Sequence, residues 1–397
     1  MPGSVIVAGA RTPIGKLMGA LSPLSAADLG AHAISAALAA VHLDPAAVEA
    51  VVMGHVVQAG AGPNTARQAA VSAGIPFAVP ASTVNKLCLS GLHAIALADL
   101  MIASGRHEVV VAGGMESMSG APHLLRGART GWKYGPAAVE DALDRDALVC
   151  AFDGVSMGAA TERYQQPFGF TRAEQDEYSA RSHQRSLSAQ ESGALAAEIA
   201  PVTVAGRRGE ETLVAADEGI RPGSTAESLG RLKPAFSAGG TVTAGNSSQL
   251  SDGGAAVVVM SADRARREGL TPLAEIGAYG TVAGPDPSLL VQPAGAIRDA
   301  LSRDGRLKTA DLDLFEINEA FAGVALASVR ELDIPLDKVN VNGGAIALGH
   351  PVGMTGTRLV LTLATELGRR GGGTGAAALC GGGGQGDALL LHVPPRA

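Results

Sequence analysis

Aromatic residues are scarce in this chain of 397 residues, where they make up 3 % of the sequence. Hydrophobic residues nevertheless make up 46 %, so the core has to be built from Ala, Val, Leu and Ile. A chain of this length exceeds what one hydrophobic core usually organises, and we expect two or three domains. The 53 glycines follow no period. This excludes a collagen-like repeat and predicts many tight turns and close backbone approaches.

Other absences narrow the class of function. The net charge of −7 gives no basic footprint for nucleic acid. No stretch of about 18 residues is apolar throughout, so no membrane span is predicted. The N-terminal MPGSVIVAGARTPIG lacks the pattern of a signal peptide and the C-terminal VPPRA is not a peroxisomal address, so we expect a cytoplasmic protein.

Cysteine is also rare, with Cys88, Cys150 and Cys380 far apart and no C-x-x-C pair. This spacing argues against a structural zinc site, and we predict no metal. Free thiols suit a reducing compartment, where a single cysteine can serve in the chemistry.

Apolar runs typical of buried strands alternate along the chain with runs typical of helices. This alternation predicts an α/β fold with mostly parallel sheets. Buried strands are predicted at 4–10, 47–58 and 108–117, and helices at 25–41, 65–74 and from about 85 to 105. From about 120 to 240 the sequence is more polar and contains a long helical pattern at 171–193, which indicates an insertion packed over the core. The stretch 241–261 returns to the core.

The last third of the chain repeats the order of sequence features found in the first third. Residues 84–114 and 339–382 each contain a Val-Asn pair, a turn with glycine, a long apolar helix and a strand that ends in Gly-Gly. The identity between the two is low. Such a repeat predicts two similar α/β halves that face each other, with Cys88, His350 and Cys380 at the seam.

Cys88 is predicted in the first turn of the helix that begins near Asn85. A helix N-terminus stabilises a thiolate, which favours a reactive cysteine. The alternative is a small core residue, because free cysteines are often buried. The small side chains of the Ser90-Gly91 pair that follows indicate that another group approaches the backbone closely here. This favours the functional interpretation of Cys88.

His350 lies between glycines and before Pro351, in a turn ahead of a helix. This position suits a base beside a thiol, although a structural histidine fits the pattern as well. Asn318, in INEAFAG, carries an amide that could orient a water or His350. A helix cap at Asn318 is the alternative.

Cys380 ends a buried strand and is followed by four glycines. Their free backbone N–H groups could form an oxyanion hole, whereas a plain hairpin turn explains the glycines but not the cysteine. The string Gly381, Gly383, Gly386 also fits G-x-G-x-x-G. That motif requires a following helix, and DALLLHV reads as a strand, so dinucleotide binding is disfavoured.

Five segments together resemble the motifs of the thiolase family, specifically the acetyl-CoA acetyltransferases, and the likeness covers essentially the whole chain. They occur in the family's order and are NKLCLSGLHAI, VVVAGGMESMS, NEAFA, GGAIALGHPVGMTG and LCGGGGQG. The resemblance implies duplicated halves layered α-β-α-β-α with an inserted loop domain. It implies an N-terminal half of 1–119 with 241–268, an insertion of 120–240 and a C-terminal half of 269–397.

The resemblance also implies the catalytic roles. Cys88 would attack an acyl thioester and carry the acyl group, and His350 would take its proton. Cys380 would remove a proton from the α-carbon of a second acetyl-CoA. Asn318, through a water, and His350 would form one oxyanion hole, and the backbone N–H groups of Cys88 and Gly382 the other.

For coenzyme A, the resemblance implies a site built largely from the insertion. Arg221 matches an arginine on the adenine side and Ser248 a serine that contacts pantetheine. The apolar wall positions are matched by Leu148, Met157, Phe236 and Phe321. Residues 120–145 match the segment that joins dimers into tetramers in short-chain members.

The activity implied is that of an acetyl-CoA C-acetyltransferase of fatty-acid metabolism. It would condense two acetyl-CoA to acetoacetyl-CoA and CoA through an acyl-Cys88 intermediate, and catalyse the reverse thiolysis. Coenzyme A is then a substrate and product, so no cofactor is expected. The expected assembly is a homotetramer, a dimer of dimers.

Two departures from the family pattern leave the acyl chain length open. Ser156 stands where short-chain members often have histidine, and VQPAGAIRDAL at 291–301 replaces the usual Gly-x-Gly-Pro. A 3-ketoacyl-CoA thiolase of broader chain length is therefore the alternative. From other classes, a catalytically silent acyl-CoA-binding protein would not need the intact site residues. A cysteine hydrolase using Cys88 and His350 would release free acid and would not explain Cys380.

Overall fold

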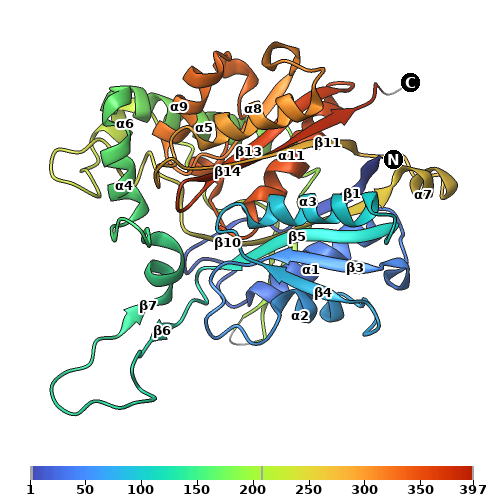
Figure 1. The fold of residues 1–397 in the computed structure, drawn as a ribbon. Helices are drawn as coiled ribbons and strands as arrows, with labels where there is room; N and C mark the ends of the chain where they lie inside the picture. Colours follow the sequence, from blue (N-terminus) through green and yellow to red (C-terminus); the bar gives the residue numbers. More distant parts are fainter. Residues whose placement is uncertain (1–2, 207–208, 396–397) are drawn as a thin grey trace.

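The computed structural model describes residues 3–206 and 209–395 and is built around one ten-stranded sheet (Figure 1). The strand order is β12-β13-β14-β11-β1-β10-β5-β3-β4, and the short β2 pairs with β10. The strands are β1 Ser4–Arg11, β2 Gly15–Lys16, β3 Ala50–Gly54, β4 Ala81–Val84, β5 Val109–Ser117, β10 Ser251–Ser261, β11 Ala274–Ala283, β12 Leu314–Ile317, β13 Gly373–Gly381 and β14 Gln385–Val393.

The sheet consists of two similar parts. They meet where β1 pairs with β11 over only two residue pairs, Val5 with Glu275 and Ile6 with Ala274. The N-terminal part runs β4-β3-β5-β10-β1 and the C-terminal part β12-β13-β14-β11. A parallel bridge between Phe315 and Val339 takes the place of β4 beside β12. The repeat predicted from the sequence is therefore a repeat of topology.

The expectation of mostly parallel strands is wrong. Parallel pairing is found for β3–β4, β3–β5 and β12–β13, and the six other strand pairs of this sheet are antiparallel. In the C-terminal part the reason is local, because the glycine-rich turn 382–384 reverses the chain directly from β13 into β14. In the N-terminal part the insertion after β5 returns the chain as the antiparallel β10.

Helices form three layers with the two parts of the sheet between them, as the resemblance predicts. The central helices are α3 Ser90–Ala103 and α11 Thr355–Arg369. Their apolar side chains share one cluster with β5 and β14, including Leu92, Leu363, Val110 and Leu389. The outer helices are α1 Ala26–Ala39 and α2 Thr65–Ser72 on the N-terminal part, and α8 Gln292–Asp304 and α9 Ala322–Leu332 on the C-terminal part.

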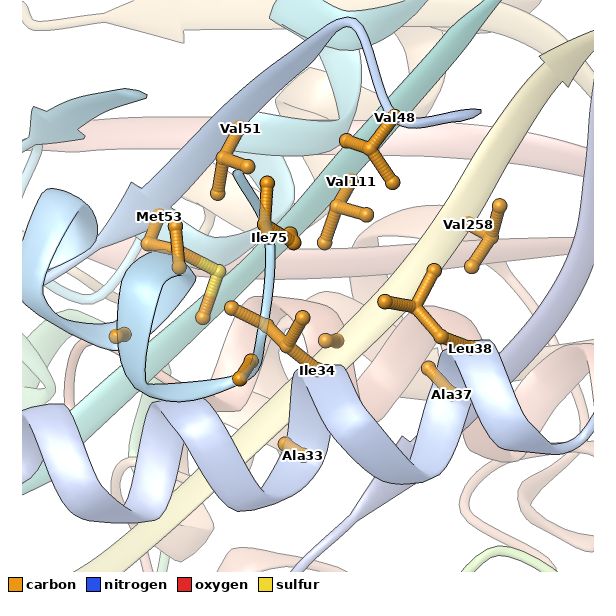
Figure 2. Packing of buried hydrophobic residues seen from close by; sticks show 14 of the residues in the cluster. Ala33, Ile34, Ala37, Leu38, Val48, Val51, Met53, Ile75, Val111 and Val258 are labelled. Atoms are coloured by element: carbon orange, nitrogen blue, oxygen red, sulfur yellow. The ribbon is translucent and has the colours of Figure 1, made fainter. Parts of the chain in front are cut away.

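The outer packing of the N-terminal part is almost wholly aliphatic. Figure 2 shows Ile34 and Leu38 of α1 facing Val51, Val111 and Val258 on the sheet. Helix α1 begins where the sequence places its cap, since the Ser25 side chain accepts a hydrogen bond from the backbone N–H of Asp28. A chain with few aromatic residues thus builds its core from branched aliphatic side chains.

The insertion lies outside the central sheet between β5 and β10. It contains β6 His123–Leu124, β7 Glu140–Asp141, α4 Met157–Tyr164, α5 Arg172–Glu191, β8 Val202–Ala205, β9 Glu211–Val214 and α6 Ala226–Gly230. The segment carrying β6 and β7 projects from the body (Figure 1). Outside the insertion, the described residues also contain the short α-helices α7 Ala262–Arg267 and α10 Ala345–Leu348.

Two local predictions are wrong at the edges of elements. Strand β3 covers Ala50–Gly54 rather than 47–58. Helix α3 begins at Ser90 rather than near Asn85, so Cys88 precedes the helix instead of lying in its first turn. The Ser90 hydroxyl donates to the carbonyl of Leu87 and accepts from the N–H of Lys86, which closes a tight loop there.

Three glycines, Gly54, Gly91 and Gly114, surround the carbonyl oxygen of Gly353 just before α11. We call this group of glycines the glycine seat. A Cβ placed on Gly54 or Gly91 would lie 2.9 Å from this oxygen, and a Cβ on Gly114 would overlap it. Gly54 ends β3, Gly91 lies in α3 and Gly114 lies in β5. Three elements of the N-terminal half thus leave room for one carbonyl of the C-terminal half.

Gly114→Ala should destabilise the fold by about 1–3 kcal/mol, because the added methyl group overpacks this seat. Chemical denaturation of the substituted and unsubstituted proteins measures the difference. Gly223→Ala is the matched control, since a Cβ there meets nothing within 4 Å, and it should change stability by less than about 0.5 kcal/mol. Equal effects of the two substitutions would contradict this account of the seat.

Candidate active site

Three loops and the end of one strand bring the predicted catalytic residues to one place. Cys88 lies just before α3, Asn318 just after β12, His350 between α10 and α11, and Cys380 near the end of β13. The Asn318 N–H donates to the carbonyl of Ala378, 3.0 Å away, two residues before Cys380. The adjacent ends of β12 and β13 therefore place Asn318 beside the second cysteine.

The residues on either side of Cys88 pack on the glycines after Cys380. A Cβ on Gly381 would lie 2.7 Å from the Leu89 side chain, and one on Gly382 would lie 2.8 Å from that of Leu87. Leu87 has the unusual backbone angle φ +53°. The glycines thus let the two cysteine segments approach, which a chain with side chains there could not do.

Cys88 is half-buried, packs against apolar side chains and has two backbone donors near its sulfur. Desolvation raises the pKa of this thiol to about 11, opposed by hydrogen bonds from the N–H groups of Cys88 itself and Gly382 and assisted by the charge of Glu116. These two N–H groups are the predicted oxyanion hole, and both are directed at the sulfur. Cys88 is therefore a neutral thiol in the free protein at neutral pH.

Cys380 is buried, with 1 % of its surface exposed. Burial raises its pKa well above the ordinary range for a thiol, and the neighbouring Cys88 raises it further. The turn that follows, Gly382–Gly384, joins β13 to β14 as a hairpin. The hairpin interpretation and the chemical one are thus both compatible with the structure, and the strand after the turn excludes a dinucleotide fingerprint.

The hydrogen bonds of His350 define which of its nitrogens is free. Its Nδ1 lies 2.7 Å from the Thr355 hydroxyl, which is also 2.9 Å from the carbonyl oxygen of Pro351. A carbonyl only accepts, so the hydroxyl donates its proton to Pro351 and accepts from Nδ1–H of His350. Nε2 then carries the lone pair, and it faces the Asn318 amide nitrogen at 3.4 Å.

His350 is held in its neutral form. Burial lowers its pKa to about 3, and the charge of Arg358 contributes to the same effect. A neutral imidazole with an available Nε2 can take a proton from a thiol. Asn318, also buried, is not a helix cap, since the N-cap residue of α9 is Phe321; the cap interpretation from the sequence is wrong.

A cleft of about 510 Å³ leads to His350. All six residues predicted to contact coenzyme A line it: Leu148, Met157, Arg221, Phe236, Ser248 and Phe321. The rings of Phe236 and Phe321 meet edge to face with centroids 6.2 Å apart. At the rim, the Arg221 guanidinium contacts Gln249 and its backbone N–H donates to His183. The cleft is thus a mostly apolar passage with a cationic group at its rim.

The two departures from the family pattern lie on different sides of the site. Ser156 lines the cleft and caps α4 by accepting from the N–H of Ala159. The segment 291–301 does not line the cleft. Its first residue, Val291, instead packs against the apolar cluster that contains Cys380 and Phe321.

Two residues with a role in the geometry were not identified from the sequence. Glu116, fully buried at the end of β5, accepts hydrogen bonds from the N–H groups of Val56, Val57 and Gly353. Thr355 sets the tautomer of His350. An acidic residue at the end of an otherwise apolar strand was a signal for Glu116, whereas nothing in the sequence distinguishes Thr355.

Within residues 3–206 and 209–395, no helix is long and apolar enough to cross a membrane. The same part of the chain contains no group of three or more His, Cys, Asp or Glu side chains able to hold a metal ion.

Comparison with known proteins places these features in a family. The family model described as thiolase, N-terminal domain matches residues 4–263, and that described as thiolase, C-terminal domain matches residues 270–393. The chain is 56 % identical to a probable acetyl-CoA acetyltransferase of Mycobacterium leprae over 99 % of this chain and all of that protein. It is 47 % identical to an acetyl-CoA acetyltransferase of Cupriavidus necator over 98 % of both chains.

Solved structures agree with the sequence relatives. The fold matches the Bacillus anthracis acetyl-CoA acetyltransferase with a TM-score of 0.96 and 42 % identity, over 99 % of both chains. It matches the human mitochondrial 3-ketoacyl-CoA thiolase with a TM-score of 0.95 and 40 % identity, again over 99 % of both. Two domain matches that span nearly the whole chain, with relatives of this similarity, show that the protein belongs to the thiolase family.

Proposed function

We propose that this thiolase is an acetyl-CoA C-acetyltransferase, which condenses two acetyl-CoA to acetoacetyl-CoA and CoA and catalyses the reverse thiolysis. The observation that carries the proposal is the meeting of two thiols, Cys88 and Cys380, with a neutral His350 at the end of an apolar cleft. A hydrolase requires one nucleophile, whereas a Claisen condensation requires a nucleophile and a separate base for carbon.

The first half-reaction moves the acetyl group to Cys88. Nε2 of His350 takes the Cys88 proton as the sulfur attacks the thioester carbonyl, and the N–H groups of Cys88 and Gly382 stabilise the oxyanion. The bond from carbonyl carbon to CoA sulfur breaks, and the CoA thiolate takes the proton of Cys380. The products are acetyl-Cys88, free CoA, an imidazolium at His350 and a thiolate at Cys380.

The second half-reaction uses this charge pair. The Cys380 thiolate removes a proton from the methyl carbon of the second acetyl-CoA, and His350 with Asn318 stabilises the enolate oxygen. The enolate carbon attacks the carbonyl of acetyl-Cys88, which forms the carbon–carbon bond and releases Cys88. The Cys88 thiolate then regains its proton from His350, so all three groups return to their starting states.

The proposal also includes the cellular compartment, the metabolic role, the assembly and the domain boundaries. A reducing compartment such as the cytoplasm suits a reaction that needs both thiols reduced. The product belongs to the short-chain end of fatty-acid metabolism. A homotetramer built as a dimer of dimers is supported by the projecting segment around β6 and β7, which carries the exposed aromatic side chains of Trp132 and Tyr134. The domain boundaries proposed remain 1–119 with 241–268, 120–240 and 269–397.

Substitution of each cysteine should separate the two half-reactions. Cys88→Ser should lower thiolysis of acetoacetyl-CoA by about 10³-fold or more, because the acyl carrier is lost. Cys380→Ser should also lose thiolysis but still accept an acetyl group on Cys88 from acetyl-CoA, detected by mass spectrometry. Cys150→Ala is the control, since the third cysteine lies outside the site, and it should keep the rate. Full activity without Cys380 would exclude its role as the base.

Acetoacetyl-CoA should be cleaved faster than 3-ketohexanoyl-CoA by about 10-fold or more, because each added methylene must fit beside Met157 and Phe321. The measurement follows loss of each 3-ketoacyl thioester with free CoA present. Comparable rates on the two substrates would instead assign the protein as a 3-ketoacyl-CoA thiolase of broader chain length, with Ser156 the first residue to test.

His350 should make stability depend on pH in acid. Its pKa is about 3 in the folded protein and near the ordinary value of ~6.5 in the unfolded chain. Below pH 6.5 the unfolded chain binds a proton that the folded protein does not, so stability falls as pH falls. Between pH 7 and 5 the native protein should lose about 2 kcal/mol more than His350→Gln, measured by denaturant unfolding at both pH values. Equal losses would show that His350 titrates normally.

A further inference from the structure

Glu319 is a buried carboxylate directly after Asn318, with 1 % of its surface exposed. Its Oε1 accepts hydrogen bonds from the Tyr178 hydroxyl at 2.9 Å and the Asn340 amide at 3.0 Å. Its Oε2 accepts from the Ser182 hydroxyl at 2.6 Å and the backbone N–H of Ile346 at 3.1 Å. One side chain therefore connects α5, the segment before α10, and α10 itself to the Asn318 loop.

The contacts on Oε1 hold the backbone that carries Asn318. The Asn340 side chain that donates to Glu319 also donates to the carbonyl of Ile317 at 2.8 Å and accepts from the Ile317 N–H at 2.8 Å. Asn318 is thus fixed through its backbone on both sides, by Asn340 before it and Glu319 after it. Its own side-chain nitrogen faces Nε2 of His350, and its Oδ1 has no hydrogen-bond partner among the described residues.

The contacts on Oε2 hold the backbone that carries His350. Ile346 lies in α10, which ends at Leu348, two residues before His350. The approach is close, because a Cβ on Gly344 would overlap the Glu319 carboxylate. Ser182, which donates to Oε2, also accepts from the Gly344 N–H at 3.1 Å. The start of α10 is thus held against the same carboxylate that holds Asn318.

We propose that Glu319 is a positioning residue that sets the distance between Asn318 and His350, the two groups assigned to the enolate oxygen. Glu319 is not expected to touch substrate, since its side chain is buried and each of its carboxylate oxygens already accepts two hydrogen bonds from the protein. It acts by anchoring both loops to one rigid group. The inference rests on the proposed function, because the oxyanion role of the pair comes from it.

Glu319→Gln is the main test. The amide can still accept from Ile346 and Ser182, but its NH₂ group cannot accept from the Asn340 amide, so the Asn318 backbone loses one restraint. The kcat for condensation should fall about 10- to 100-fold, because a shift below 1 Å misplaces the donors. The KM for acetyl-CoA should stay within about 2-fold, since the cleft is unchanged. Ser182→Ala, which removes one donor, should give a smaller loss of the same kind.

A double-mutant cycle with Asn318→Ala separates positioning from general damage. If Glu319 acts through the pair, Glu319→Gln should cost less than about 3-fold once Asn318 is gone, because the geometry it sets no longer matters. Glu366→Gln is the matched control. Glu366 is also buried, at 3 % exposure, and accepts four hydrogen bonds, from Asn342, Arg369 and Arg370. Its substitution should change kcat by less than about 3-fold in both backgrounds.

Two outcomes would overturn the proposal. One is a normal kcat in Glu319→Gln. The other is the same fold-loss with and without Asn318, which would mean that Glu319 only stabilises the fold. The unsubstituted enzyme tests the proposed function independently, because that function fails if the native protein forms and cleaves no acetoacetyl-CoA. Loss of activity confined to the variants concerns Glu319 alone.

Discussion

The fit of the Gly353 carbonyl into its glycine seat is the constraint on which the site depends. The seat is formed by β3, α3 and β5 of the N-terminal half, whereas Gly353 belongs to the C-terminal half. The N–H of the same residue donates to Glu116 at 2.9 Å. The two peptide groups on either side of the Gly353 Cα thus fix the start of α11 against the N-terminal half. Because His350 lies three residues earlier, a displacement of Gly353 would move the base relative to the nucleophile.

Burial then decides the charge state of the two thiols and of His350. The pKa of each thiol is raised and that of His350 is lowered. The resting site therefore carries no net charge on these three groups. Charge separates when the acetyl group is transferred, at the moment when His350 and Cys380 need their ionised forms. A site that was charged at rest would have to desolvate these ions before substrate arrived, which costs several kcal/mol per ion.

The fold class, and which residues meet at the candidate site, could be predicted largely from the sequence, whereas the hydrogen bonds that arrange them could not. The motifs around Cys88, Asn318, His350 and Cys380 were local strings and could be read directly. The wrong helix start at Asn85 came from a local preference overridden by Ser90, whose hydroxyl closes the preceding loop. Glu116, Thr355 and Glu319 act through specific hydrogen bonds, and those of Glu116 and Glu319 join residues that are mostly far apart in the chain. Hydrophobic periodicity carries no information about such bonds.

Several of the few aromatic side chains lie around the cleft and the Cys380 segment. The main sheet packs mostly on aliphatic side chains, with Phe315 of β12 as an aromatic exception. Phe236 and Phe321 line the cleft, and Phe170 packs in the cluster that contains Cys380. A Cβ on Gly383, in the turn after Cys380, would lie 3.0 Å from the ring of Phe152. Aromatic rings offer large, rigid contact surfaces with few rotatable bonds. Their placement gives a stiff wall where a long, flexible thioester must be held. The aliphatic core needs no such shape, because branched side chains already fill the space between helices and sheet.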